Sequence, residues 1–465
     1  MTAAFDANGA AGGPEAAAAG AVDVARDFDI AIVGAGPVGA ACALLLARVW
    51  PDPARILVMD ARPAGAAAGD PRALAVSEGS MQLLARVIDT RELVAAPIRM
   101  VHVSQRGHFG RTVLAADEMG VAALGQVVRY RELIAPLEAA LAASGVNVAR
   151  PVAGAPVADG DGWRIELPDG PARAALLVHA EGGVFERSPA ADEAAPAAHA
   201  AANGAPDAPR AEAGRATTSA ARVRDYGQTA VICEVEPALP RRGWAFERFT
   251  RGGPLALLPV DDGERMALVW CAAPDEAARI AALDDARFLA ELGNTFGSRL
   301  GRFRAAGPRH AYALGQLRRD TGNEREVAIG NAAQVLHPVA GQGFNLGLRD
   351  AAALVAALAE GFGAAPPADA PATAAVVASS GDPIASPGLA AAAAPAFDPA
   401  AALARYRAAR QRDRDFVLGA TDTLARLFTL PLPGMSHAAG AAIAALDLLP
   451  ALRQPVARAL MFGLR

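Results

Sequence analysis

Hydrophobic residues first form a regular pattern near Asp29. The β-branched run Asp29–Val33 predicts a buried strand, and the uncharged Ala/Leu segment that ends at Arg48 predicts a helix. A second apolar run, Ile56–Met59, predicts another strand. Strands that alternate with helices pair in parallel, so this part of the chain is predicted to be a Rossmann-like domain of the α/β class.

A different pattern occupies the middle of the chain, where short runs rich in Val, Leu, Phe and Trp are separated by turn residues. Such runs predict β-strands joined by turns. The four runs are Tyr226–Val235, Gly243–Thr250, Gly253–Val260 and Arg265–Trp270. We predict an antiparallel sheet that forms a second domain and walls off a substrate pocket, which gives the whole chain α+β character.

A helical pattern returns after residue 330. A small-residue turn and a Pro/Gly loop open onto a helix that is predicted from Phe344 to about Leu358. Further on, Asp398 suits an N-cap and Pro399 the first position of a helix that is predicted to run to about Leu418.

The last part of the chain is apolar but interrupted. Pro431, Pro433 and Gly434 break the charge-free stretch 427–446 too early for a helix that spans a membrane. A packed pair of C-terminal helices is the expected structure. A surface that touches lipid or a partner is the alternative.

Composition narrows the class of protein. The chain has 465 residues, 53% hydrophobic and 20% charged, with a net charge of −5, so it is long enough for two or three domains. It contains no lysine, and no basic patch is interleaved with aromatic residues, which argues against nucleic-acid binding. Cys42, Cys233 and Cys271 are far apart and are expected to be buried thiols. We expect no metal site, because His and Cys lack ligand spacing.

The first strand and helix enclose a glycine fingerprint. Gly34, Gly36 and Gly39 form G-x-G-x-x-G, in which the glycines permit a tight turn, close approach of a pyrophosphate and close packing of helix on strand. Asp60 follows the second strand, where an acid accepts hydrogen bonds from ribose hydroxyls. Together these elements predict a dinucleotide site.

A second glycine-bearing loop lies 300 residues later, at Gly341 and Gly343. The glycines let the backbone approach a flat partner, and the predicted helix start at Phe344 adds unpaired N–H groups with partial positive charge. A lone Gly-x-Gly more often caps a surface helix. The fingerprint at the N-terminus favours a ligand-binding loop instead.

These motifs carry a resemblance to a known family. The fingerprint, the segments Glu247–Thr250 and Gly253–Pro259, and above all Gly330–Gln334 with His337–Gly347 are similar to those of the ubiquinone-biosynthesis hydroxylases. These are single-component FAD monooxygenases of the para-hydroxybenzoate hydroxylase type. Asn331 and Gln334 stand where most relatives have Asp and His, which is most similar to the branch that hydroxylates polyprenyl methoxyphenols.

The resemblance covers about residues 27–187, 222–360 and 398–465, and it implies a division of the chain. The predicted parts are a disordered tail (1–26), an FAD-binding domain (27–187 and 323–361, with part of the substrate region inserted in the first piece), a substrate-domain sheet (222–322), two low-complexity insertions (188–221 and 362–397) and C-terminal helices (398–465).

The resemblance also implies the cofactor residues. Gly34, Gly36, Gly39 and Asp60 would hold the ADP part of FAD, and Arg72 would lie near the pyrophosphate. Gln126 would contact the flavin and Asn331 the ribityl chain. The isoalloxazine edge would be lined by Pro338, Gly341, Gly343, Phe344 and Asn345.

Two positions depart from the family pattern. Glu181 replaces the Asp of an Ala-Asp-Gly motif, so its contact with FAD or with the nicotinamide donor is expected to be displaced or lost. Asn331 keeps donors and acceptors for a ribityl hydroxyl, so FAD binding is expected to survive. No catalytic residue is assigned, and His337 is expected to be structural.

The implied activity is hydroxylation of a polyprenylated phenol with dioxygen and NAD(P)H, in which FAD supplies the oxygen chemistry and the protein the geometry. The expected location is the cytoplasm, with peripheral contact to the inner face of the membrane or to other ubiquinone-biosynthesis proteins. Two other functions remain open. One is hydroxylation of a small soluble phenol, and the other is a flavin-binding or empty scaffold subunit.

Overall fold

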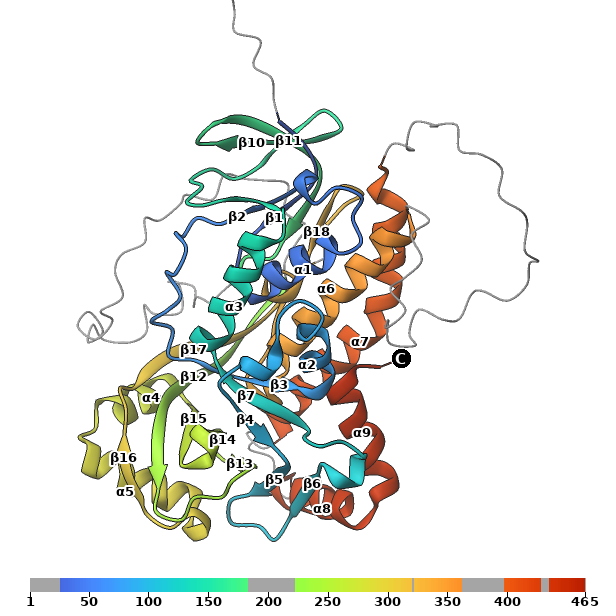
Figure 1. Cartoon of the computed structure of the whole chain (residues 1–465). Coiled ribbons are helices and arrows are strands. Elements are labelled where there is room, and N and C mark those ends of the chain that lie inside the picture. Colours follow the sequence, from blue (N-terminus) through green and yellow to red (C-terminus); the bar gives the residue numbers. More distant parts are fainter. Residues whose placement is uncertain (1–25, 183–221, 320–321, 362–396, 428–434, 465) are drawn as a thin grey trace, which may run out of the picture.

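The computed structural model describes residues 26–182, 222–319, 322–361, 397–427 and 435–464 (Figure 1). The predicted tail and the two low-complexity insertions lie outside the described residues, except for Arg26 and Phe397. The predicted α/β fold with a second sheet and C-terminal helices is confirmed.

The first sheet contains the predicted strands β1 (Arg26–Val33) and β2 (Ile56–Met59), which pair in parallel. Its strand order is β8-β2-β1-β11-β10-β9, with β18 paired to β11. The added strands are β8 (Asn147–Ala149), β9 (Val157–Asp159), β10 (Gly162–Leu167), β11 (Gly170–His179) and β18 (Glu326–Ala328). Thus a segment near residue 326 completes a sheet that begins at residue 26.

Helices cover the face of this sheet that carries Ile30 and Ile32, both fully buried. They are α1 (Pro37–Ala47), α3 (Tyr130–Ala143) and α6 (Gln342–Glu360), with α7 (Pro399–Leu427) packed outside α6 (Figure 1). The other face is closed by Trp163 and Ile165 of β10. Burial on both faces explains why the second half of β1, from Ile30 to Val33, is entirely apolar.

The second sheet has nine strands in the order β19-β17-β12-β15-β14-β13-β5-β6, with β16 paired to β12. The four predicted strands correspond to β12 (Arg222–Pro237), β13 (Trp244–Thr250), β14 (Gly253–Val260) and β15 (Arg265–Ala272), and neighbours among them are antiparallel. The sheet is not purely antiparallel, because β5 (Met100–Gln105) joins β13 in parallel. The remaining strands are β6 (Arg111–Ala115), β16 (Phe303–Ala306), β17 (His310–Arg318) and β19 (Gln334–Val335).

Helices α4 (Pro274–Ala282) and α5 (Asp285–Phe296) pack on one face of the second sheet. A small sheet of β3 (Ala73–Ser77), β7 (Gly125–Arg129) and β4 (Ala95–Ile98) connects the two large sheets, and α2 (Glu78–Leu84) follows β3. The small sheet therefore lies where a ligand shared by both domains would be bound.

The C-terminal helices differ from the prediction in length. The helix predicted to end near Leu418 continues to Leu427, since Thr421 and Ala425 are buried and extend its inner face. A packed pair follows, α8 (Met435–Leu448) and α9 (Pro450–Phe462). None of the helices in the described ranges is both long and apolar enough to cross a membrane.

Candidate functional site

The glycine fingerprint forms the turn between β1 and α1. Gly34 has φ +102°, and a Cβ there would lie 2.6 Å from the backbone nitrogen of Glu181. A Cβ at Gly39 would lie 1.9 Å from the carbonyl oxygen of Gly34. Gly36 lines a pocket, and a Cβ there would make an ordinary van der Waals contact with the Tyr130 hydroxyl at 3.6 Å. Two glycines are therefore required by packing, and Gly36 leaves a gap beside the helix start.

Asp60 lies at the end of β2, directly beside this turn. Its carboxylate accepts the backbone N–H groups of Ala35 and Arg62, each at 2.8 Å. Burial favours the neutral carboxyl, but these hydrogen bonds outweigh it and hold the pKa of Asp60 below its usual value. Asp60 is thus a permanent anion and acceptor at the mouth of the turn.

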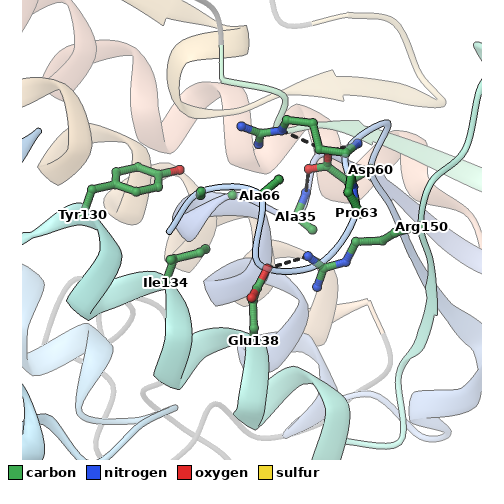
Figure 2. Close-up of a pocket in the computed structure, with 11 residues that line it drawn as sticks. Ala35, Asp60, Pro63, Ala66, Tyr130, Ile134, Glu138 and Arg150 are labelled. Atoms are coloured by element: carbon green, nitrogen blue, oxygen red, sulfur yellow. Dashed lines mark hydrogen bonds and ion pairs between the residues drawn. The ribbon is translucent and has the colours of Figure 1, made fainter. Parts of the chain in front are cut away.

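A pocket opens between Asp60 and helix α3 (Figure 2). Tyr130, Ile134 and Glu138 come from α3, and the loop after β2 supplies the opposite wall. Glu138 accepts a hydrogen bond from Arg150 at 2.6 Å at its edge. Of the residues that line the pocket, the sequence analysis had identified only Gly36 and Asp60.

Arg72 lies close to the same pocket. Its guanidinium carbon is 4.7 Å from the centre of the Tyr130 ring, the residue whose hydroxyl faces Gly36. Asp70 pairs with Arg72 at 2.6 Å. The structure therefore brings Arg72 to the fingerprint, as expected for a group near a pyrophosphate, with Asp70 as its partner.

Strand β3 leads from Arg72 to the second glycine-bearing loop. Asn345 is 1% exposed, and its side-chain oxygen accepts the N–H of Ser77 while its amide donates to the carbonyls of Ala75 and Gly341. All hydrogen-bonding groups of this amide but one lone pair are used within the protein. The Asn345 side chain therefore fixes the loop to β3, and only its backbone can face a ligand.

The helix after this loop begins at Gln342, two residues before the predicted start at Phe344. Gly341 is its N-cap in the left-handed conformation (φ 60°), and a Cβ there would lie 3.1 Å from that of Ala75. The first turn of α6 contains no acidic residue, so its N–H groups keep their partial positive charge.

Glu247 of β13 reaches the same loop. The N–H of Ala340, a non-glycine residue at φ 61°, donates a hydrogen bond to its carboxylate. Removal of the carboxylate from water outweighs this single bond and raises the pKa of Glu247 to about 7. A group with this pKa can hold or release a proton near neutral pH, and backbone strain at its partner is typical of functional sites.

Helix α1, which follows the fingerprint turn, packs against the residues on either side of the second glycine-bearing loop. Val38 of α1 lies between Gly330 and Gly347, since a Cβ at Gly330 would be 3.2 Å, and one at Gly347 2.8 Å, from its methyl groups. The side-chain oxygen of Asn331 would be 3.9 Å from a Cβ at Gly343. Segments 300 residues apart in the chain thus form one continuous surface.

Gln126 and Glu181 occupy less direct positions. Gln126 is the second residue of β7, opposite Val76 of β3, and is partly buried. Glu181 borders Gly34, but its carboxylate bonds to His179 at 2.8 Å. His179 also bonds to Glu326 at 2.8 Å. Burial would lower the pKa of His179, but these two carboxylates outweigh it and raise the pKa to about 9.

Two motif residues have structural roles. His337 is fully buried, and Nδ1 accepts the N–H of Val339, so Nε2 carries the proton and donates to Gln228 at 2.9 Å. Burial lowers its pKa to about 4, which agrees with the expected structural role. Gln334 donates to the fully buried Asp350 at 2.6 Å.

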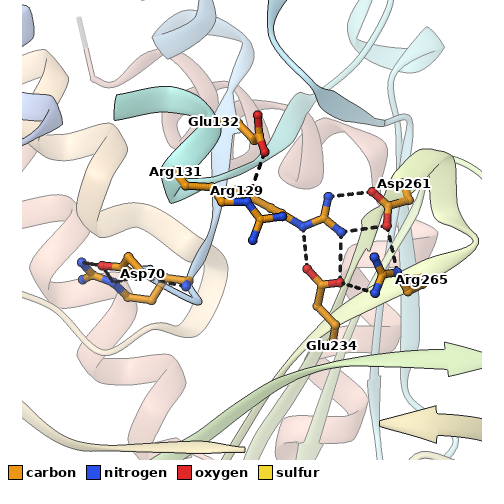
Figure 3. Close-up of polar contacts among 8 residues, drawn as sticks. Asp70, Arg129, Arg131, Glu132, Glu234, Asp261 and Arg265 are labelled. Carbon is orange, nitrogen blue, oxygen red and sulfur yellow. Dashed lines mark hydrogen bonds and ion pairs between the residues drawn. The ribbon is translucent and has the colours of Figure 1, made fainter. Parts of the chain in front are cut away.

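An ion-pair network joins the two domains at the edge of this site (Figure 3). Arg129, at the end of β7, pairs with Glu234 of β12 and with Asp261, both at 2.6 Å. The Arg129 side chain is only 10% exposed. The hydrogen bond from Arg129 lowers the pKa of Asp261 to about 2. The network holds the nucleotide side of the molecule against the second sheet.

Comparisons with known proteins agree with this geometry. Residues 196–368 match a family described as an FAD binding domain. A ubiquinone hydroxylase of Rhodospirillum rubrum is 35% identical over 236 residues, 50% of this chain and 48% of that protein. An uncharacterised Synechocystis protein is 27% identical over 407 residues, 87% of this chain and 86% of that protein. The 3-demethoxyubiquinol 3-hydroxylase of Escherichia coli is 33% identical over 133 residues, 28% of this chain and 33% of that protein.

Solved structures share the fold. The p-nitrophenol 4-monooxygenase of Pseudomonas putida superposes with a TM-score of 0.63 at 15% identity, covering 95% of this chain and all of that one. Klebsiella pneumoniae HpxO, complexed with FAD and uric acid, gives 0.61 at 16% identity, covering 94% and 97%.

The chain spans about half or less of the two ubiquinone hydroxylases named above, but most of the Synechocystis protein. The resemblance that the motifs indicated is confirmed, and the match to an FAD binding domain supports FAD as the cofactor. In sequence the chain is thus similar to ubiquinone hydroxylases over part of its length, and in fold it is similar to solved monooxygenases.

Proposed function

We propose that the protein is an FAD-dependent hydroxylase that inserts one oxygen atom of dioxygen into a polyprenylated phenol of ubiquinone biosynthesis, with NAD(P)H as electron donor. The observation that carries this proposal is the packing of Val38, in the fingerprint segment, against Gly330 and Gly347, which lie on either side of the loop 338–345 and bring that loop close to the fingerprint. The names of the Rhodospirillum and Escherichia relatives support the substrate class.

The residues present fit FAD. The gap at Gly36 admits a pyrophosphate at the start of α1, and Asp60 offers an acceptor for the ribose hydroxyls. Strand β3 then leads to the loop whose backbone and helix start suit an electron-rich ring edge. We assign FAD to Gly34, Gly36, Gly39, Asp60, Arg72, Gln126, Asn331, Pro338, Gly341, Gly343, Phe344 and the Asn345 backbone.

Glu181 is assigned to the FAD site only in part. Its carboxylate already has His179 as a partner, although its backbone borders Gly34. We therefore assign only its backbone to the FAD site. This refines the expectation that its side-chain contact is displaced.

Bound FAD would supply electrons and the activation of dioxygen, and the chain would supply proton handling and a dry setting. Glu247 is the group that we assign to accept the phenol proton, since its carboxylate contacts the ring-side loop and its pKa lies near 7. The positive end of α6 would favour negative charge on the adjacent ring edge.

A spectrum and a turnover assay test the proposal. Purified protein should be yellow, and a prenylated phenol should stimulate NAD(P)H oxidation and be recovered with one added hydroxyl group. Stimulation by small carboxylated phenols alone would favour the soluble-substrate hydroxylase. A colourless protein that stays inert after addition of FAD would favour the scaffold reading and contradict the proposal.

A further inference from the structure

A second pocket lies at the tip of the β5–β6 hairpin and beside the end of α5. It has a volume of about 260 Å³. Arg111, Arg248 and Arg299 line it, and no Asp or Glu is among its lining residues. Glu247 and Arg248 are adjacent on β13 and point to opposite faces of the sheet, so this pocket and the ring-side loop are separated by the sheet.

The arginines lack carboxylate partners within the part of the chain that the structure describes. Arg248 donates only to the Thr295 carbonyl at 3.1 Å and to the Ser104 hydroxyl at 3.2 Å, which fixes its guanidinium. Burial, with Arg299 and Arg106 nearby, lowers the pKa of Arg248. Like charges have been gathered here without a counter-charge, which costs stability unless an anion is bound.

Buried polar atoms beside the arginines are also unsatisfied. Gln105, which lines the pocket, is 6% exposed, and its Oε1 has no hydrogen-bond partner. His102 lies two residues before Ser104 on the same face of β5. It is 5% exposed, and its Nε2 also has no hydrogen-bond partner. Buried polar groups are normally paired, and of these two atoms only His102 Nε2 can donate a hydrogen bond to an anion, since Gln105 Oε1 is an acceptor that faces Gly440.

The chemistry of the ligand follows from the donors and from the rim. The planar guanidinium of arginine can donate two parallel hydrogen bonds to the oxygens of a phosphate group. These side chains therefore suit a phosphate better than a monatomic anion. Phe109 at the hairpin tip is 78% exposed, beside the exposed Arg106. An exposed aromatic side chain flanked by arginines is typical of a surface that meets the headgroup region of a bilayer.

We propose that this pocket binds the phosphodiester headgroup of an anionic phospholipid while Phe109 enters the interface. The proposal rests on the proposed function in one respect, since a polyprenylated substrate is held in a membrane. The binding itself does not depend on FAD or on turnover, so the two proposals can fail separately.

The test is flotation of the full chain with two vesicle types, phosphatidylcholine alone and phosphatidylcholine with about one third phosphatidylglycerol. The double variant Arg111→Gln/Arg299→Gln should bind the anionic vesicles about 25-fold more weakly, about fivefold for each arginine. Phe109→Ala should also weaken binding. The matched control is Arg164→Gln/Arg173→Gln, which removes two charges from β10 and β11 at the opposite end of the molecule (Figure 1) and should bind as wild type.

Flavin absorbance of every variant reports whether the fold and the FAD site survive. Equal loss of binding in the two double variants would overturn the proposal, because only total charge would then matter. Absence of wild-type binding to anionic vesicles would also overturn it. Stabilisation by inorganic phosphate that depends on Arg299, without vesicle binding, would assign the pocket to a free phosphate and overturn the lipid assignment.

Discussion

The two ends of the candidate FAD site place a carboxylate in opposite environments. Asp60, at the nucleotide end, receives two backbone N–H groups, and its pKa is lowered. Glu247, at the ring end, receives one, and its pKa is raised to about 7. Two backbone donors and the Arg62 guanidinium keep Asp60 a fixed acceptor, whereas Glu247, with a single backbone donor, can exchange protons.

The ends also differ in how they are assembled. The nucleotide end is built within residues 34–72, with α3 as the opposite wall. The ring end combines β3, β13 and the loop before α6, which are far apart in the sequence. Substitutions at the nucleotide end should therefore change FAD affinity, and substitutions at the ring end should change the turnover rate.

The largest effect is expected for Gly36→Val. The added side chain would fill the gap beside the start of α1, so FAD binding should be lost while the fold remains, because φ at Gly36 is −66° and suits any residue. Flavin absorbance measures FAD binding, and thermal unfolding measures whether the fold remains. Gly154→Val, at an exposed glycine with open space around it and outside the nucleotide end, is the matched control and should remain yellow. Retention of FAD by Gly36→Val would show that the nucleotide lies elsewhere.

Glu247→Gln should lower turnover about 100-fold or more with little change in FAD affinity, since a general base contributes on the order of 10² to 10⁴. In wild type kcat/KM should fall as the pH decreases through about 7, and the variant should lose this dependence. A raised carboxyl pKa destabilises the fold as pH rises from its unfolded value to about 7, so the variant should be more stable above pH 7. Glu247→Asp should keep the pH dependence. An unchanged pH profile in Glu247→Gln would remove Glu247 from the mechanism.

Asp60→Asn should weaken FAD binding about 10- to 100-fold, because the amide has one oxygen and can accept only one of the two backbone N–H groups that the carboxylate accepts, and the negative charge is lost. Turnover at saturating FAD should stay close to that of wild type. Since the pKa of Asp60 is lowered, wild-type affinity should be constant across neutral pH. Titration of apoprotein with FAD gives the affinity, and equal affinities for both proteins would contradict the role of Asp60.

The smallest effect concerns His179, between Glu181 and Glu326. Its folded pKa of about 9 exceeds the unfolded value near 6.5, so the stability that it adds is complete below about pH 6.5 and is lost as the pH rises through about 9. We expect a contribution of about 1–2 kcal/mol, because Glu181 is half exposed. Denaturant unfolding at pH 6 and pH 9.5 should show this difference in wild type and not in His179→Gln. A difference of the same size in the variant would place its origin elsewhere.

Much of the nucleotide end could be predicted from the sequence, because glycines, strand, helix and acid lie within one short segment and each has a local physical requirement. The strands of the second sheet were also predictable from their pattern, but the parallel addition of β5 to β13 was not, since it joins residues 100–105 to residues 244–249.

The ring end could be predicted only in part. The glycines at 341 and 343 indicated close approach, yet the use of the Asn345 amide by Ser77 and Ala75 depends on long-range packing. Glu247 lies in one of the motif segments, but its altered pKa arises from the fold around it and has no signal in the sequence. Tyr130 offered no signal beyond its place at a helix start.

The most direct test of the account is the electron density of FAD in crystals of the whole chain. We predict one FAD per chain, with its ribose at Asp60, its pyrophosphate at Gly36 and its ring against the loop 338–345. A ring bound away from that loop, or an adenosine on the far side of Asp60 with no connection between the two glycine-bearing turns, would contradict the account.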